Sequence, residues 1–212
     1  HGEAKRTLIK LNEIPDYVKQ ATIAVEDKNF YKNPGVEWTG ILRAVWVDIT
    51  RGDLKQGGST ITQQFVRNAI LTREKTFIRK IKEIVLAVEL EQKFTKDEIL
   101  QMYLNEIPYG QNAYGIQAAA QTYFAKNAKD LTLAESAYLA ALPQAPTFYT
   151  PNGPNKNRLE ARKNLILQLM EDQNYIDARQ RQQAQDEKVI FQKVKDSILA
   201  PHFVLYVQGL LA

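Results

Sequence analysis

The chain has 212 residues, a hydrophobic fraction of 44% and a charged fraction of 25%, which excludes disordered and collagen-like classes and suits one globular domain, with or without a minor lobe. Its formal net charge of +4 favours an anionic partner, such as nucleic acid, a phosphate group or a lipid headgroup layer. Cysteine is absent and the only histidines are His1 and His202, which excludes disulfides, cysteine or histidine metal clusters and Ser-His-Asp triads.

The first strong helix pattern lies in the stretch Tyr17 to Gly35, whose apolar residues recur at i, i+3 and i+7 as one buried stripe: Val18, Ala21 and Val25. The pair Glu26-Asp27 follows this stripe, before Pro34-Gly35 stops the helix pattern. Glu26 therefore lies near a helix C-terminus, where the dipole disfavours an anion and a carboxylate is suited to accept a proton. On residue types alone, a surface helix end with two solvated acids remains an alternative.

The next pattern, from Trp38 to Ile49, predicts a strongly amphipathic helix with Gly52 just past its end. Arg43 and Arg51 flank its apolar face, which carries two tryptophans. Such a helix belongs either to the core or to a membrane interface, where tryptophan rings act as anchors, and both readings stay open.

A glycine-rich stretch follows, from Gln56 to Asn68. Either Ser59 or Thr60 can cap a helix that begins there, and one face of that helix carries a hydroxyl, an amide and a guanidinium: Thr60, Gln64 and Arg67. Backbone amides, the helix dipole and a cation together favour a phosphate, although the spacing is not that of a Walker loop. A flexible loop with a solvated helix face is the alternative.

The helix predicted after Thr72 has an apolar stripe that we expect to be buried: Phe77, Ile78, Ile81, Ile84, Val85 and Val88. Its polar residues then face solvent or a cleft: Lys75, Arg79, Lys80, Lys82 and Glu83. These charges form either a surface ion network or a grip for a diphosphate.

The remaining chain predicts further helices and no strand of convincing length. Capping boxes at Thr95 with Glu98 and at Thr132 with Glu135 mark two helix starts. A proline-rich connection at residues 143–154 precedes helices around Leu159 to Met170 and after Asp177. The predicted fold class is therefore all-α.

Five stretches in this order resemble the motifs of the peptidoglycan glycosyltransferase module of class A penicillin-binding proteins: Glu26-Asp27-Lys28-Asn29-Phe30-Tyr31, Gly57 to Gln64, Arg79-Lys80-Ile81-Lys82-Glu83, Tyr103 to Ile107 with Gly110, and Ala119 to Phe124. The resemblance covers roughly residues 14–175. It implies a glycosyltransferase domain at residues 1–176, with a small lobe at about 38–72. Residues 177–212 are then a helical segment and the start of a linker toward a transpeptidase domain.

The resemblance implies a lysozyme-like bilobal helical fold, with a large lobe and a small membrane-facing lobe, that polymerises lipid II. It assigns catalytic roles to Glu26 and Glu83 and no metal ligand. The residues that it implies for substrate binding are Asp27, Phe30, Gly58, Ser59, Thr60, Gln64, Arg67, Asn68, Arg79, Lys80 and Asn105.

The implied partners are lipid II, the growing glycan chain, the membrane surface and phosphoglycolipid inhibitors of the moenomycin type, and not nucleic acid. No tightly bound cofactor is implied, although a magnesium ion can join the diphosphate. The implied location is the extracytoplasmic face of the bacterial plasma membrane.

The chain departs from the family at three positions, where the family usually has histidine, lysine and glycine: Asn33, Arg67 and Ala125. We therefore assign Asn33 no catalytic role and expect Arg67 to keep its diphosphate contact with altered geometry. Two other functions remain open, a lysozyme-like enzyme that cleaves peptidoglycan and a non-catalytic basic module that binds nucleic acid or membrane.

Overall fold

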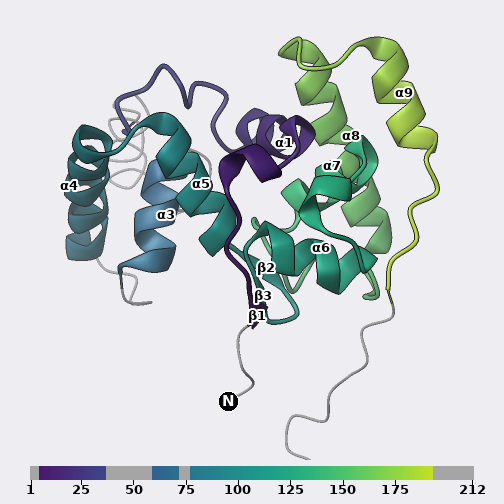
Figure 1. The fold of residues 1–212 in the computed structure, drawn as a ribbon, viewed down its shortest axis with the longest axis horizontal. Helices are drawn as coiled ribbons and strands as arrows, with labels where there is room; N and C mark the ends of the chain where they lie inside the picture. The colour runs from purple at the N-terminus through teal and green to yellow at the C-terminus, as the bar shows by residue number, and fades with distance from the viewer. Residues whose placement is uncertain (1–4, 37–58, 72–76, 193–212) are drawn as a thin grey trace, which may run out of the picture.

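The computed structural model describes residues 5–36, 59–71 and 77–192, and this part of the chain is mostly helical (Figure 1). Its helices are α1 (Asp16–Glu26), α3 (Ile61–Ala69), α4 (Phe77–Lys93), α5 (Lys96–Glu106), α6 (Ile116–Phe124), α7 (Leu133–Ala141), α8 (Lys156–Asp172) and α9 (Ala178–Asp186). Short 3-10 helices precede α1 and α7, namely η1 (Leu11–Glu13) and η2 (Ala128–Asp130). The predicted all-α class is confirmed.

One small sheet joins the beginning of the chain to its middle. Its strands, in spatial order, are β1 (Lys5–Arg6), β3 (Ala113–Tyr114) and β2 (Pro108–Gly110). β1 is parallel to β3 and β2 is antiparallel to it, with an irregular register. Strands of two or three residues are too short to show an alternating pattern, so the sequence did not predict them.

The predicted helix starts are confirmed at both capping boxes. The Thr95 hydroxyl accepts from the amide of Glu98 at the start of α5, and the Thr132 hydroxyl accepts from the amide of Glu135 at the start of α7. In each box the glutamate carboxylate accepts in return from the threonine amide. These bonds satisfy amides that the first helical turn leaves without an intrahelical partner.

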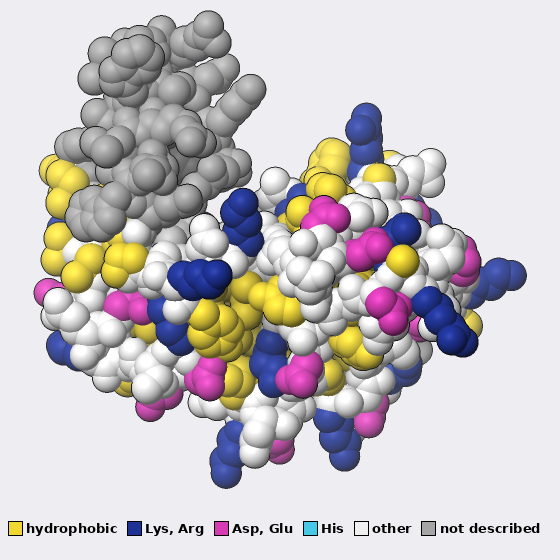
Figure 2. Space-filling model, turned by 90° about the horizontal axis from the view of Figure 1, so that it is seen from above, with side chains coloured by type: hydrophobic (Ala, Val, Ile, Leu, Met, Phe, Trp, Pro, Cys, Tyr) yellow, Lys and Arg dark blue, Asp and Glu magenta, His cyan; other side chains and the backbone are white. Residues whose placement is uncertain are grey.

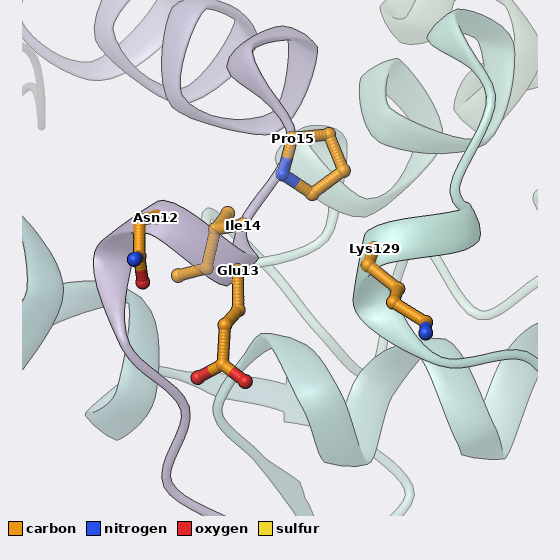
Figure 3. Close-up of a pocket in the computed structure, with 5 residues that line it drawn as sticks. All are labelled: Asn12, Glu13, Ile14, Pro15 and Lys129. Carbon is orange, nitrogen blue, oxygen red and sulfur yellow. The ribbon is translucent and has the colours of Figure 1, made fainter.

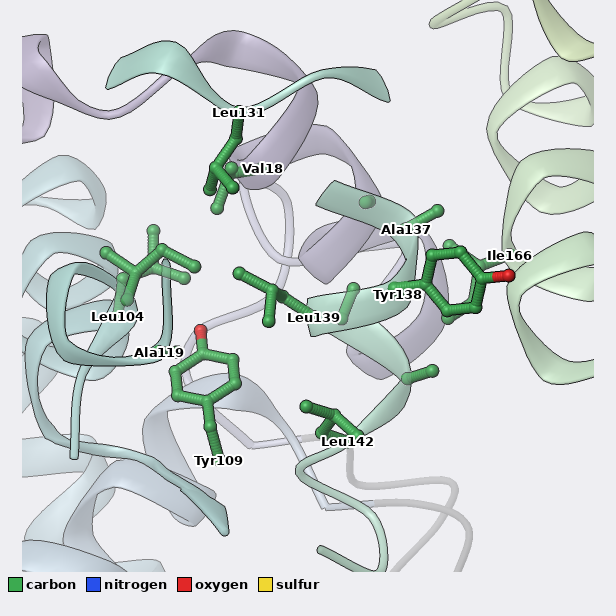
Figure 4. Packing of buried hydrophobic residues seen from close by; sticks show 14 of the residues in the cluster. Val18, Leu104, Tyr109, Ala119, Leu131, Ala137, Tyr138, Leu139, Leu142 and Ile166 are labelled. Carbon is green, nitrogen blue, oxygen red and sulfur yellow. The ribbon is translucent and has the colours of Figure 1, made fainter. Parts of the chain in front are cut away.

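The main core lies where α1 packs on α7 and α8 (Figure 4). α7 is buried from Ala134 to Ala141, and its many alanines allow neighbouring helices to approach closely. In Figure 4, Val18 of α1, Leu104 of α5 and Leu139 of α7 gather in one cluster, as the predicted stripe of α1 requires. α1 is therefore fixed along its length by apolar packing.

A second, smaller cluster holds α3 against α4, and it corrects the predicted orientation of α4. Its buried members are Val36, Val66 and Ala87. Three residues of the stripe that we expected to be buried are instead 65%, 47% and 50% exposed: Ile78, Ile81 and Val85. Hydrophobic side chains show at the left edge of Figure 2, the side on which α4 lies in Figure 1.

The prediction for α4 is wrong because the helix buries Glu83, which is 1% exposed, on the face that packs against α3. The ion pairs of Glu83 with Lys80 and Arg67 turn this face of α4 inward, although the apolar periodicity predicts that another face is buried. Ile84 and Val88 pack against the smaller cluster, as expected, and are partly buried.

Several predicted features lie outside the described residues. They are the helix at residues 38–49, Gly58, the start of the helix predicted after Thr72, the start of the linker toward a transpeptidase domain and most of the small lobe. The predicted domain boundaries therefore stay a prediction. Among the helices that the structure does describe, none has the length and apolar character needed to cross a bilayer.

Candidate active site

The candidate site begins at Glu26, the last residue of α1. One carboxylate oxygen, Oε2, accepts a hydrogen bond of 2.8 Å from the side-chain amide of Gln64 on α3. The other, Oε1, is buried and has no hydrogen-bond partner in the described part of the chain. A buried carboxylate oxygen with free lone pairs is suited to accept a proton from a bound hydroxyl group.

Gln64 is held by the start of α3. Thr60 caps this helix, since its hydroxyl accepts from the amide of Gln63 and its own amide donates to the Gln63 side chain. The Thr60 hydroxyl also donates to the carbonyl oxygen of Gly35 over 2.5 Å. The capping that we predicted for Ser59 or Thr60 is thus performed by Thr60, and it joins α3 to the loop after α1.

Gly35 is a position at which only glycine fits. Its φ is +82°, a left-handed conformation, and a Cβ atom there would lie 2.4 Å from the Cγ atom of Glu91. Replacement would therefore disturb the carbonyl group to which Thr60 donates.

Asp27 faces α3 rather than open solvent. Its two oxygens accept from the side-chain amide of Asn33 at 2.9 and 3.0 Å, and one also accepts from the backbone amide of Ile61 at 3.2 Å. Burial raises the pKa of Asp27, while the hydrogen bonds from Asn33 and Ile61 and the charge of Lys96 oppose this rise. Asn33 therefore has a structural role, which the sequence did not reveal.

The cations of the site gather around Glu83. Its Oε1 atom lies 2.5 Å from Lys80 Nζ and 3.9 Å from Arg67 Nη1. Both cations also donate to the Ser59 hydroxyl, at 3.2 Å from Lys80 and 3.5 Å from Arg67. Glu83 is buried, whereas the Lys80 side chain is 41% exposed and that of Arg67 is 32% exposed. The carboxylate thus anchors two cations that can still meet an anion from solvent.

A continuous chain of contacts links the two predicted catalytic carboxylates. Gln64 Nε2 lies 2.8 Å from Glu26 and 3.4 Å from the carbonyl oxygen of Ser59, whose hydroxyl contacts both Lys80 and Arg67. The structure therefore brings a candidate base next to a cationic cluster, although the residues come from α1, α3 and α4.

The other predicted site residues are placed differently. Phe30 is fully buried in the main core, and Asn68 is exposed at the end of α3. Arg79 is half-buried on α4, next to Lys80. The Asn105 side chain bonds to the backbone of Ile9 and Gln101, so it ties the N-terminal segment to α5. Direct roles of these four in substrate binding stay predictions.

One contact at the site was missed by the sequence analysis. Tyr103 of α5, which the sequence analysis named only as the first residue of a motif, donates from its hydroxyl to the side-chain carbonyl oxygen of Gln64 over 3.2 Å. The residue type could have indicated such a contact, because a buried tyrosine hydroxyl usually finds a hydrogen-bond partner.

A hollow on the described surface lies elsewhere, at η1 and η2 (Figure 3). It measures about 370 Å³ and is lined by Asn12, Glu13, Ile14, Pro15 and Lys129. None of the predicted site residues lines this hollow, so we assign it no part in the reaction.

Comparison with known proteins identifies a family and several relatives of the chain. The family model described as Transglycosylase matches residues 1–171. The chain is 46% identical over 203 residues to penicillin-binding protein 1F of Bacillus subtilis (strain 168) and 44% identical over 193 residues to penicillin-binding protein 1A of Neisseria gonorrhoeae. These matches cover 95% and 91% of this chain but only 28% and 24% of the relatives, so the chain spans about a quarter of their length.

A crystal structure of penicillin-binding protein 1A from Haemophilus influenzae is similar in fold, with a TM-score of 0.59 and 26% sequence identity. The match covers 100% of this chain and 22% of that one. It agrees with the predicted lysozyme-like helical fold.

Proposed function

Because this chain belongs to the transglycosylase family, as a peptidoglycan glycosyltransferase module of the class A penicillin-binding type, we propose that it polymerises lipid II into β-1,4 glycan strands. The donor is a growing glycan chain on undecaprenyl diphosphate, and the acceptor is lipid II. The observation that carries the proposal is the Oε1 atom of Glu26, which has no hydrogen-bond partner among the described residues, together with the nearby cluster of Arg67, Lys80 and Glu83.

In the proposed reaction, Glu26 takes the proton from the acceptor 4-hydroxyl group while that oxygen attacks the anomeric carbon of the donor. The new glycosidic bond forms as the bond to the diphosphate breaks, and the α configuration of the donor is inverted to β. General-base catalysis of this kind typically contributes 10² to 10⁴-fold in rate, about 3 to 5 kcal/mol.

The leaving group explains the cations. A diphosphate departs with its negative charge and needs neutralisation rather than a proton, which Arg67 and Lys80 can supply from their half-exposed positions. Glu83 then acts by orienting these two cations. We include Arg79 in the same role because it belongs to the stretch Arg79 to Glu83 that resembles a motif of the family.

A magnesium ion at the diphosphate stays a prediction. Within the described residues, no three histidine or carboxylate side chains lie close enough to hold a metal ion. We assign charge neutralisation to the arginine and lysine side chains of the cluster.

The lipid-linked substrates also imply contact with a membrane, on the extracytoplasmic face. The exposed apolar residues Ile78, Ile81 and Val85 of α4 are compatible with such a contact. The helix predicted at residues 38–49 is the other candidate for membrane contact and lies outside the described residues.

A double variant tests the membrane role of this helix. The Trp46→Ser and Ile49→Ser double variant should stay folded, lose liposome co-sedimentation and polymerise better in detergent than in membranes. Unfolding, or unchanged liposome binding, would contradict this role.

Incubation with lipid II tests the proposed function directly. The expected product is a glycan chain that muramidase digests. Release of sugar from finished peptidoglycan without polymerisation would instead favour a hydrolase, and the absence of both activities would favour a binding module. A phosphoglycolipid of the moenomycin type should compete with lipid II, since both present phosphate groups to the cations.

A further inference from the structure

Tyr103 occupies a position that the proposed reaction has not used. It lies on α5, is fully buried, and donates its hydroxyl proton to Gln64 Oε1 over 3.2 Å. Gln64 in turn donates from Nε2 to Glu26 Oε2 over 2.8 Å. A hydroxyl, an amide and a carboxylate from three different helices therefore form one line of hydrogen bonds.

Which group donates and which accepts along these hydrogen bonds depends on the orientation of the Gln64 side-chain amide. The two ends of an amide are nearly the same in shape, and the hydrogen bonds around it decide which end points where. Glu26, as a carboxylate, requires the NH₂ end. The backbone carbonyl oxygen of Ser59 also accepts from the NH₂ end, over 3.4 Å, and Tyr103 provides a donor for the carbonyl end, so all three neighbours select the same orientation.

Burial and the negative charge of Glu26 raise the pKa of Tyr103 well above its ordinary value, so its hydroxyl keeps its proton. This matters when Glu26 has accepted a proton from the substrate. With the proton on Oε1, Oε2 becomes the carbonyl oxygen of a neutral carboxyl group and still accepts from the NH₂ end of Gln64, but without the negative charge that strengthened this bond. Tyr103 offers the same donor to the carbonyl end before and after the proton transfer. The amide therefore keeps its orientation through the proton transfer.

We propose that Tyr103 is a positioning residue for the base: it fixes the amide of Gln64, which occupies Oε2 of Glu26 and leaves Oε1 to receive the proton. Oε1 is buried and has no partner in the part of the chain that the structure describes. This inference rests on the proposed function, since it assigns a proton-accepting atom to that reaction.

Tyr123 offers a matched control. Its hydroxyl is also buried, and it donates to the carbonyl oxygen of Tyr109 over 2.8 Å, without a hydrogen bond to Gln64 or Glu26. Tyr123→Phe and Tyr103→Phe each remove one buried hydroxyl group from the same core. A purely structural role for Tyr103 predicts the same kinetic effect for both variants.

The experiment measures kcat and KM for lipid II polymerisation, with circular dichroism as the check on folding. Tyr103→Phe should lower kcat about tenfold, the factor expected from one lost hydrogen bond, with KM nearly unchanged. Tyr123→Phe should keep kcat within about threefold of the parent. Equal kcat values for the two variants would overturn the inference.

Two further variants separate Tyr103 from Gln64. In a Gln64→Leu background, Tyr103→Phe should lower kcat by less than about twofold, because the group that it orients is gone. A full additional loss would overturn the inference. Gln64→Glu keeps an acceptor for Tyr103 and removes the donor to Glu26, so it should lower kcat at least as much as Tyr103→Phe, and it decides the question even if Tyr103→Phe fails to fold. An unchanged kcat of this variant would overturn the inference.

Failure of the proposed function has a different signature. A parent chain that makes no glycan would reject the proposed function, and the inference with it.

Discussion

The two sides of α1 differ in what they bury. Toward α7 and α8, the helix buries small apolar side chains such as Val18 and Ala21 in a continuous core. At its C-terminal end it meets α3 through hydrogen bonds, which the Gln64 side chain donates to Glu26 and the Ile61 amide donates to Asp27. One helix thus carries an apolar anchor along its length and the proposed base at its end, so that packing and the proposed chemistry are separated along it.

The largest expected effect is at the reactive end. Glu26→Gln should lower polymerisation by 10² to 10⁴-fold, because an amide cannot accept the proton, while folding and lipid II binding are retained. Radiolabelled lipid II incorporation measures the rate. Glu89→Gln on the exposed face of α4 is the control and should behave as the parent. Retention of more than about a tenth of the rate by Glu26→Gln would contradict its role as the base.

Substitutions in the apolar core should change the stability of the fold. Leu139→Ala removes a side chain that is 1% exposed in the main core, so it should destabilise the fold by about 2 to 5 kcal/mol, as measured by urea denaturation. Val85→Ala on the exposed face of α4 should cost less than about 0.5 kcal/mol. A large cost at Val85 would restore the buried stripe that the sequence predicted for α4.

Removing a cation of the candidate site is expected to weaken the binding of lipid II. Arg79→Ala should weaken lipid II binding about tenfold, because a charge-assisted contact to the diphosphate is lost. Lys82→Ala removes a charge from the exposed face of the same helix and should have little effect. Equal affinity of the Arg79 variant for lipid II and for a phosphate-free disaccharide analogue would argue for a solvated surface network.

Glu83→Gln tests the anchor of that cluster. It should reduce turnover while the fold persists, because Lys80 and Arg67 lose the carboxylate that orients them. Turnover equal to that of the parent would remove Glu83 from the site.

The smallest effect is expected at Tyr31, in the loop after α1. Burial first, and then the hydrogen bond to Asp97, raise the pKa of Tyr31 to about 12. A raised pKa of this kind contributes stability below the unfolded value of about 10, and this contribution is lost as pH rises through about 12. The ultraviolet difference between the parent and Tyr31→Phe isolates this titration. A midpoint near that of a free tyrosine would show that the loop is not held against α5.

The sequence predicted local features well and long-range ones poorly. Capping at Thr95 and Thr132 and the stripe of α1 depend on neighbours a few residues apart, so periodicity and residue type suffice. The orientation of α4 depends on a buried charge, which periodicity cannot register.

The candidate site shows the same limit. Glu26, Gln64 and Glu83 were assigned because their motifs resemble those of a family. The bond from Tyr103 to Gln64 spans 39 positions and that from Lys96 to Asn33 spans 63, so neither motif order nor helical spacing could predict them. Such contacts follow only from the packing of α3 and α5 and of the loop after α1.

The end of α6 carries a consequence for heat resistance. Ala125 closes this helix with a φ of 54° and a ψ of 34°, a left-handed conformation in which a Cβ atom costs about 1 to 2 kcal/mol. Its amide donates to the carbonyl oxygens of Ala120 and Gln121, so the cap is formed in spite of this strain. Ala125→Gly would relieve the strain at some cost in chain entropy, and it should raise the melting temperature by about 2 to 4 °C per kcal/mol gained. Calorimetry can measure that shift, and an unchanged or lower melting temperature would mean that the cap is unstrained. This chain can therefore be made more heat-resistant at a position that is not among its predicted site residues.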